Sequence, residues 1–208
     1  MALTKSSFVA VLGIVLFAVN CAHADDSPED VRRRIGNGNP VDGKDKAALC
    51  KSCHGEDSDS ASNIPKLAGQ YADYIQRQIH NFQEGTRTDP TMANISATLT
   101  NRRDLADISA YFASQNQMKG MPTRNDEGEK LYLDKGCLNC HGEIGKGKPA
   151  YNALFPVIGG QHKEYLIKQM KDFKTGARDT DISGIMGLLA NQMTDSEIEA
   201  VAEFLSGR

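Results

Sequence analysis

Apolar side chains recur every three or four residues in two long stretches of the chain, a spacing typical of helices with one buried face. The two runs are Tyr71, Tyr74, Ile75, Ile79 and Phe82, and Tyr165, Leu166, Met170 and Phe173. Gly85 and Gly176 follow these runs closely, and glycine is common just beyond the end of a helix. The pattern therefore predicts two amphipathic helices.

More helices are predicted from start signals and periodicity. Thr194 and Glu197 form a capping-box pattern ahead of an apolar-periodic segment that reaches Leu205. The other predicted helical segments are Thr100–Phe112, Lys44–Leu49 and Gly128–Asp134. No segment shows the alternation of a half-buried strand, so we expect an all-α fold.

The chain contains an internal repeat. Cys50-Lys51-Ser52-Cys53-His54-Gly55 recurs 87 residues later as Cys137-Leu138-Asn139-Cys140-His141-Gly142. Pro65 to Gln70 recurs 91 residues later as Pro156 to Gln161, and Met92 and Thr100 recur 94 residues later as Met186 and Thr194. The growing offset indicates small insertions in loops of the second copy. The chain is thus predicted to contain two copies of one module.

The repeat divides the chain into tandem domains. We expect an N-terminal domain at 25–118, a linker at 119–126 and a C-terminal domain at 127–208, because the connecting stretch is rich in turn-forming residues. The segment 25–39, first charged and then glycine-rich, is predicted to be a loose N-terminal arm.

The first residues have the pattern of a secretory signal peptide. Lys5 precedes an apolar run from Phe8 to Val19, and Ala22-His23-Ala24 places small residues at a cleavage site. This run of about twelve residues is shorter than the roughly 18 that a membrane-spanning helix needs. We therefore predict a signal peptide at 1–24, cleaved after Ala24, and a periplasmic protein that is soluble or only peripherally membrane-associated.

Composition narrows the classes further. The 24 Lys and Arg residues against 27 Asp and Glu residues leave a net charge of −3, with no long basic run, which argues against nucleic-acid binding. The chain has no Trp and only 6% aromatic residues. Modules of this size have marginal cores, so an additional buried group is expected to complete each one.

Each repeat carries a Cys-x-x-Cys-His motif, which is the attachment pattern of c-type haem. The thiols of Cys50 and Cys53, and of Cys137 and Cys140, would bind the two vinyl groups of a haem, and His54 and His141 would bind iron. Zinc sites made of two Cys pairs usually place the pairs roughly 15–20 residues apart, and thioredoxin-like motifs need a β-α-β context. Two vicinal disulfides would leave both histidines unexplained. We therefore predict two covalently bound haem c groups.

The sixth iron ligand is predicted to be methionine in both modules. Met92 and Met186 occupy equivalent positions in the two repeats, and a Met thioether raises the reduction potential and suits electron transfer. Met193 is the rival in the second module, but its repeat partner is Leu99, which favours a core role. The carbonyls of Pro65 and Pro156 are candidate acceptors for the second N–H of each histidine.

These motifs together resemble the dihaem cytochrome c4 family over nearly the whole chain after the leader. The resemblance also includes the two Pro-x-x-[Ala/Gly]-Gly-Gln segments and Arg87-Thr88-Asp89-Pro90-Thr91-Met92. It implies two class I cytochrome c domains packed about a pseudo-twofold axis. It further implies an electron carrier, not an enzyme, that transfers single electrons from a quinol-oxidising cytochrome bc-type complex to a terminal oxidase.

An alternative function within the same electron-transfer chemistry is kept open. Similar dihaem modules are electron-accepting subunits of flavin-dependent dehydrogenases such as sulfide dehydrogenase, and a flavoprotein would then be the partner.

The sequence also suggests where an acidic partner would dock. Lys135, Lys146 and Lys148 surround the second haem motif, and complementary charge raises encounter rates.

Overall fold

The computed structural model describes residues 28–56, 59–148, 154–181 and 183–208, and in these ranges it is helical without strands. The helices are α1 (Pro28–Ile35), α2 (Pro40–Lys46), α3 (Ala48–His54), α4 (Ala72–Gln83), α5 (Pro90–Ala97), α6 (Arg102–Ser114), α7 (Asp126–Asp134), α8 (Leu138–His141), α9 (Lys163–Thr175), α10 (Ile185–Asn191) and α11 (Asp195–Ser206). The expected all-α class is confirmed. Among the described helices, none is long and apolar enough to cross a membrane. The predicted signal peptide lies outside the described residues.

The same pair of helices crosses in each module. In the first module α2 packs against α6, and in the second α7 packs against α11. Each crossing depends on a glycine: a Cβ on Gly43 would lie 1.9 Å from the carbonyl oxygen of Asp107, and one on Gly128 would lie 2.0 Å from that of Ala200. The absence of a side chain lets the two backbones approach closely.

Side-chain caps define where these helices begin. Asn39, Asn101 and Asn125 cap α2, α6 and α7, and each accepts hydrogen bonds from backbone N–H groups of the first turn. Thr194 and Glu197 form the predicted capping box of α11. The segment expected from Thr100 begins two residues before α6, because the side chain of Asn101 is the cap and the helix starts at Arg102.

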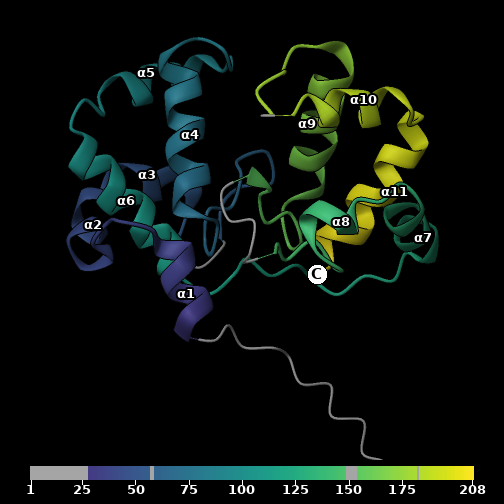
Figure 1. Cartoon of the computed structure of the whole chain (residues 1–208), viewed down its shortest axis with the longest axis horizontal. Helices are drawn as coiled ribbons and strands as arrows, with labels where there is room; N and C mark the ends of the chain where they lie inside the picture. The colour runs from purple at the N-terminus through teal and green to yellow at the C-terminus, as the bar shows by residue number, and fades with distance from the viewer. Residues whose placement is uncertain (1–27, 57–58, 149–153, 182) are drawn as a thin grey trace, which may run out of the picture.

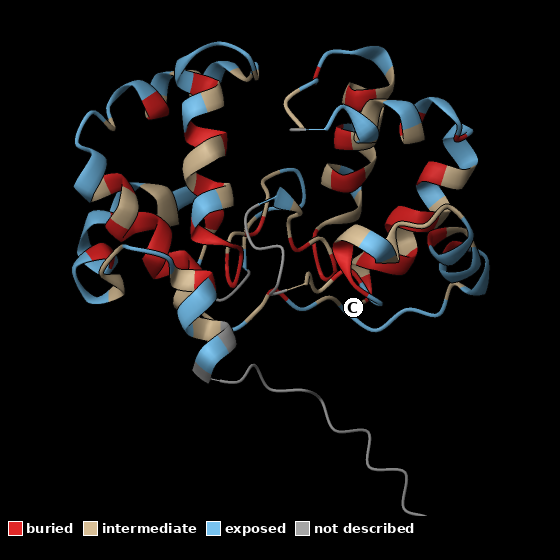
Figure 2. Ribbon diagram, in the orientation of Figure 1, coloured by how far each residue is buried: buried red, intermediate tan, exposed pale blue. Residues whose placement is uncertain are grey.

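Each module has its own apolar core, visible as the buried faces of α4, α6, α9 and α11 (Figure 2). The first core contains Ala47, Ile75, Ile108, Tyr111 and Phe112; the second contains Tyr132, Leu166, Met193, Ile198, Val201, Ala202, Phe204 and Leu205. These residues come from the helical periodicities of the sequence. The long helices α4 and α9 were therefore predicted correctly, whereas the expected helix at 44–49 is divided between α2 and α3.

Part of the expected N-terminal arm is not loose. Residues 28–35 form α1, which packs against α6. Arg34 is buried and donates hydrogen bonds to the carbonyl oxygens of Ala113 (2.7 Å) and Gln115 (3.3 Å). The prediction of a loose arm was wrong here because it considered local composition and not this tertiary anchor.

The two modules lie side by side, with α4 and α9 facing each other across the middle of the molecule (Figure 1). Two reciprocal amide contacts join them. The side chain of Gln70 exchanges two hydrogen bonds with the backbone of Val157 (2.8 and 3.0 Å), and Gln161 does the same with Lys66 (2.9 and 3.0 Å). Because these pairs are equivalent under the repeat, the arrangement is pseudo-twofold.

Candidate haem-binding sites

A cavity of about 680 Å³ extends across both modules. Its wall includes six of the predicted site residues: His54, Met92, Cys137, Cys140, His141 and Met186. Cys50 packs against the core of the first module, and Cys53 is exposed at the surface. The structure thus brings the predicted histidines and methionines of both repeats to one continuous space.

Both Cys-x-x-Cys-His motifs lie on a single helical turn that ends at the histidine. His54 is the last residue of α3 and His141 the last of α8. Gly55 and Gly142 follow with φ of 71° and 82°, a left-handed conformation that glycine adopts without strain, and turn the chain sharply after each ligand. Within the described residues the cysteines form no disulfide, so their thiols are free to bind a cofactor.

A proline carbonyl orients each histidine ring, as predicted. Nδ1 of His54 donates to the carbonyl oxygen of Pro65 at 2.8 Å, and Nδ1 of His141 donates to that of Pro156 at 2.9 Å. A proton on Nδ1 leaves the lone pair on Nε2 for iron. Burial lowers the pKa of both histidines, which favours the neutral imidazole that a metal ligand must be.

The two candidate methionines are held in matching ways. The backbone N–H of Met92 donates to Oδ1 of Asp89 at 2.9 Å, and that of Met186 donates to Oδ2 of Asp181 at 3.1 Å. Both side chains are half-buried at the cavity. The side chain of Met193 also reaches the cavity wall, but it is only 3% exposed and belongs to the second core. The geometry therefore supports Met186 over Met193.

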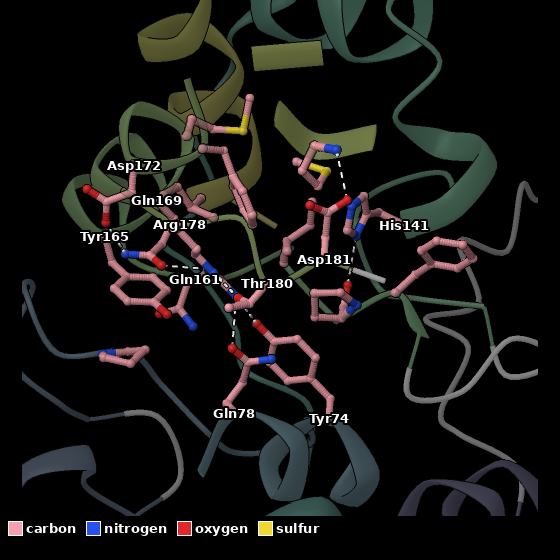
Figure 3. A pocket seen from close by; sticks show the side chains of 18 of the residues that line it. Tyr74, Gln78, His141, Gln161, Tyr165, Gln169, Asp172, Arg178, Thr180 and Asp181 are labelled. Carbon is pink, nitrogen blue, oxygen red and sulfur yellow. Dashed lines mark hydrogen bonds between the residues drawn. The ribbon is translucent and has the colours of Figure 1, made fainter. Parts of the chain in front are cut away.

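A network of arginines, tyrosines and glutamines joins the modules at the cavity (Figure 3). Arg178 donates to Gln169 (2.6 Å), Gln78 (3.0 Å) and Tyr74 (3.1 Å). Arg87 makes the repeat-equivalent contacts, with distances of 2.8 Å to Gln78, Tyr165 and Gln169. The two arginines also form an antiparallel backbone bridge with each other. Arg87 and Arg178 lie 91 residues apart, as equivalent positions of the repeat do, but the sequence does not show what they contact.

The residues that line the cavity have the chemistry expected of a haem-binding site. The cavity walls are apolar where the macrocycle would pack, with Ile79 and Phe82 in the first module and Leu166 and Phe173 in the second. Among the described residues, no carboxylate forms an ion pair with the cavity arginines. Nε of Arg77 is buried with no hydrogen-bond partner in this part of the chain. Guanidinium groups that have no carboxylate partner among the described residues, beside an apolar cavity, match a cofactor that carries propionate carboxylates on an apolar ring.

The lysines of the expected docking site in the second module make contacts within the protein. Nζ of Lys146 donates to the carbonyl oxygens of Met118 (2.5 Å) and Gly159 (2.9 Å), so its charge is bound to the protein's own backbone. Lys135 forms an ion pair with Glu197 at 3.2 Å. Two of the three lysines are therefore engaged in contacts within the protein that the linear sequence does not reveal, and docking of an acidic partner at Lys135, Lys146 and Lys148 stays a prediction.

Comparisons with known proteins agree with this geometry. The family model described as cytochrome c matches residues 41–116 and 125–208. The chain is 39% identical to cytochrome c4 of Pseudomonas aeruginosa, an alignment that covers 82% of this chain and 89% of the relative. The solved structure of reduced recombinant cytochrome c4 from Pseudomonas stutzeri has a TM-score of 0.74 at 35% identity, and the match covers 82% of this chain and 98% of that one.

A further relative is named for a different setting. The thiosulfate dehydrogenase electron acceptor of Stutzerimonas stutzeri is 30% identical, with 82% of each chain covered. Like the relatives named cytochrome c4, it aligns with both repeats of this chain. From the duplicated motifs, the shared cavity and these similarities, it follows that the chain belongs to the cytochrome c family as a dihaem electron-transfer protein of the cytochrome c4 type, with two covalently attached haem c groups.

Proposed function

We propose that this protein is a periplasmic shuttle whose two haems are both closed by histidine and methionine. Cys50 and Cys53 attach the first haem, with His54 and Met92 as iron ligands. Cys137 and Cys140 attach the second, with His141 and Met186 as ligands. The haems supply one-electron chemistry when bound. The protein orients the ligands, keeps both histidines neutral and excludes water with its apolar walls.

The observation that carries this proposal is the duplicated ligand geometry. Each histidine donates to a proline carbonyl, and the N–H of each methionine is held by an aspartate. A catalytic haem needs an open or easily lost sixth position, whereas here a methionine whose backbone N–H donates to an aspartate lines the cavity in each module. The duplication therefore supports electron transfer at both haems and argues against a catalytic role for either one.

The proposed donors and acceptors follow from the similarity to cytochrome c4 and from the leader pattern of residues 1–24. Electrons would come from a quinol-oxidising cytochrome bc-type complex and go to a terminal oxidase, both accessible from the periplasm. Rapid mixing of the reduced protein with an oxidase should give two oxidation phases, one for each haem. A single haem that exchanges electrons while the other stays reduced would contradict the shuttle.

Absorption spectroscopy of the ferric protein tests the ligand assignment directly. Methionine–iron ligation gives a weak band towards the red end of the spectrum, and two such haems should double its intensity relative to one. A band of half that intensity would show that one haem lacks its methionine. Binding of carbon monoxide by the reduced unmodified protein would show the same.

The acceptor role in an enzyme complex is a second candidate. The relative named as a thiosulfate dehydrogenase electron acceptor favours it for thiosulfate oxidation rather than for the flavin-dependent oxidation expected from the sequence. The assay is reduction of the oxidised protein by a thiosulfate dehydrogenase with thiosulfate. Reduction at a rate that saturates with protein concentration would support this role, and no reduction beyond a control with free haem would exclude it.

A further inference from the structure

The arginine network at the module interface breaks the pseudo-twofold symmetry at one position. Arg87 and Arg178 are repeat equivalents and make matching contacts, but Arg77 of α4 has Lys168 of α9 as its equivalent. The side chain of Lys168 is 60% exposed and forms an ion pair with Asp172 at 2.5 Å. The charge of Lys168 is therefore paired with a carboxylate and exposed to solvent. Arg77 has no such carboxylate partner among the described residues, and its Nε is buried.

The guanidinium group of Arg77 lines the cavity, where it contacts the ring of Tyr74 and the backbone of Leu154. Its centre is 5.4 Å from the ring centroid of Tyr74, and one terminal nitrogen donates to the carbonyl oxygen of Leu154 at 3.4 Å. Its Nε is buried and has no acceptor among the described residues. Burial lowers the pKa of Arg77, and the nearby charge of Arg178 adds to this effect. A buried N–H without a partner is costly, so an acceptor at this position would stabilise the fold.

Three guanidinium groups converge on this part of the cavity. Arg77, Arg87 and Arg178 all act electrostatically on Tyr74, and their hydrogen-bond partners are neutral side chains or carbonyl groups. The carboxylates of Asp73 and Asp172 interact electrostatically with Arg77 and Arg178, but neither forms an ion pair with a guanidinium group of this cluster. Arg178 is buried, and Arg77 and Arg87 are half-buried. Positive charges partly withdrawn from water in this way are unfavourable unless an anion lies nearby. Haem propionates are the anions that this cavity would receive.

The contact with Leu154 indicates which haem Arg77 serves. Leu154 lies in the second module, next to Phe155, whose ring packs edge-on against His141 with centroids 6.4 Å apart. Pro156, the following residue, accepts the hydrogen bond from Nδ1 of His141. Arg77 thus comes from the first module but touches the segment that holds the axial histidine of the second haem.

We propose that Arg77 binds a propionate of the second haem across the module interface, a contact without an equivalent at the first haem. This inference rests on the proposed attachment of a haem at Cys137 and Cys140. A positive charge next to a haem favours the ferrous state, which has one positive charge fewer than the ferric state. Arg77 therefore raises the reduction potential of the second haem relative to that of the first and favours electron flow towards the second haem.

The test compares the potentials of both haems in variants of the purified dihaem protein. Haem methyl resonances in NMR spectra, followed during a reductive titration, identify each haem separately. Arg77→Gln should lower the potential of the second haem and change the equilibrium constant for electron exchange between the haems about tenfold, which corresponds to about 59 mV. Arg77→Lys retains the charge and should preserve most of the difference.

Lys168→Gln is the matched control, because it removes the repeat-equivalent charge and should leave both potentials unchanged. Three results would overturn the inference: unchanged potentials in Arg77→Gln, a shift confined to the first haem, or an equal shift in Arg77→Lys and Arg77→Gln. Thermal melting of each variant verifies that the modules remain folded. A missing methionine–iron band in the unmodified protein would contradict the ligand assignment but not this comparison, since Arg77 acts through the propionate.

Discussion

His54 and His141 are prepared for iron binding by one backbone contact each. The proline carbonyl fixes the ring and its tautomer before any metal arrives, and burial keeps the imidazole neutral. Met92 and Met186, if they bind the iron as proposed, would close it to other ligands. At the residue scale, the chemistry of each module is therefore set by the hydrogen-bond partners of two ligands.

Removal of one methionine should open one haem and leave the other closed. In Met92→Ala the first haem should bind carbon monoxide in the reduced state, with one equivalent bound per protein, and the unmodified protein should bind none. Met186→Ala should open the second haem in the same way. Spectrophotometric titration with carbon monoxide measures the stoichiometry. Opening of the second haem by Met193→Ala instead would show that the assignment of Met186 is wrong.

Asp107 should make the first module sensitive to acid. Its carboxylate is buried and accepts hydrogen bonds from Nζ of Lys46 and from the backbone N–H of Asn39, and these contacts hold its pKa below the ordinary value. A carboxylate whose folded-state pKa is depressed stabilises the fold above its unfolded pKa of about 3.9. That stabilisation is lost as the pH falls from there through the lower pKa of the folded state.

Asp107→Asn should accordingly lower the melting temperature at pH 7 and lose less stability than the unmodified protein below about pH 4. Circular dichroism melts over a pH series measure both effects. Glu84→Gln, an exposed carboxylate at the end of α4, is the control and should leave the profile unchanged. Parallel profiles for Asp107→Asn and the unmodified protein would contradict this role.

At the scale of elements, each module depends on one helix crossing, that of α2 with α6 in the first module and of α7 with α11 in the second. Close packing at Gly43 and Gly128 brings the helix axes together, and side-chain caps set the register of the helices at the crossing. The second module has the clearest cap, since Thr194 and Glu197 satisfy each other's backbone N–H groups at the start of α11. Thr194 directly follows Met193, which is part of the second core, so the start of α11 is fixed next to a buried side chain.

Thr194→Ala should destabilise the second module by about 1 kcal/mol, the usual cost of removing a side-chain cap. Guanidinium unfolding followed by helical circular dichroism gives the free energy. Thr175→Ala removes an exposed hydroxyl that bonds only within α9, and it should change stability by less than about 0.5 kcal/mol. Equal losses of unfolding free energy in the two variants would show that the capping box stabilises the module no more than an exposed hydroxyl does.

At the scale of the whole molecule, the two modules share one cavity and one interface. Reciprocal contacts of Gln70 and Gln161 and the arginine network hold the two parts together around it. Each module is small and poor in aromatic residues, so much of its core volume must come from the haem. We therefore expect haem binding and folding to be coupled.

Loss of haem attachment in one module should unfold that module alone. In the double variant Cys50→Ala with Cys53→Ala, haem content should fall to half and about half of the helical circular dichroism signal should be lost. Ser52→Ala changes an exposed residue between the two cysteines and is the matched control. Full helical content with one sharp transition in the double variant would show that the first core is stable without its haem.

The duplicated Cys-x-x-Cys-His motifs, the repeat-matched methionines and the periodic apolar positions determined the family, the cofactor and the long helices, because each depends on spacing along one helical turn or one amphipathic face. The position of Arg34, the occupied state of Lys146 and the convergence of Arg77, Arg87 and Arg178 were decided only by the tertiary structure. Arg34 is held by helix packing within the first module, where its partner Ala113 is distant in the sequence. The three arginines are brought together by packing of the two modules, which the linear sequence does not specify.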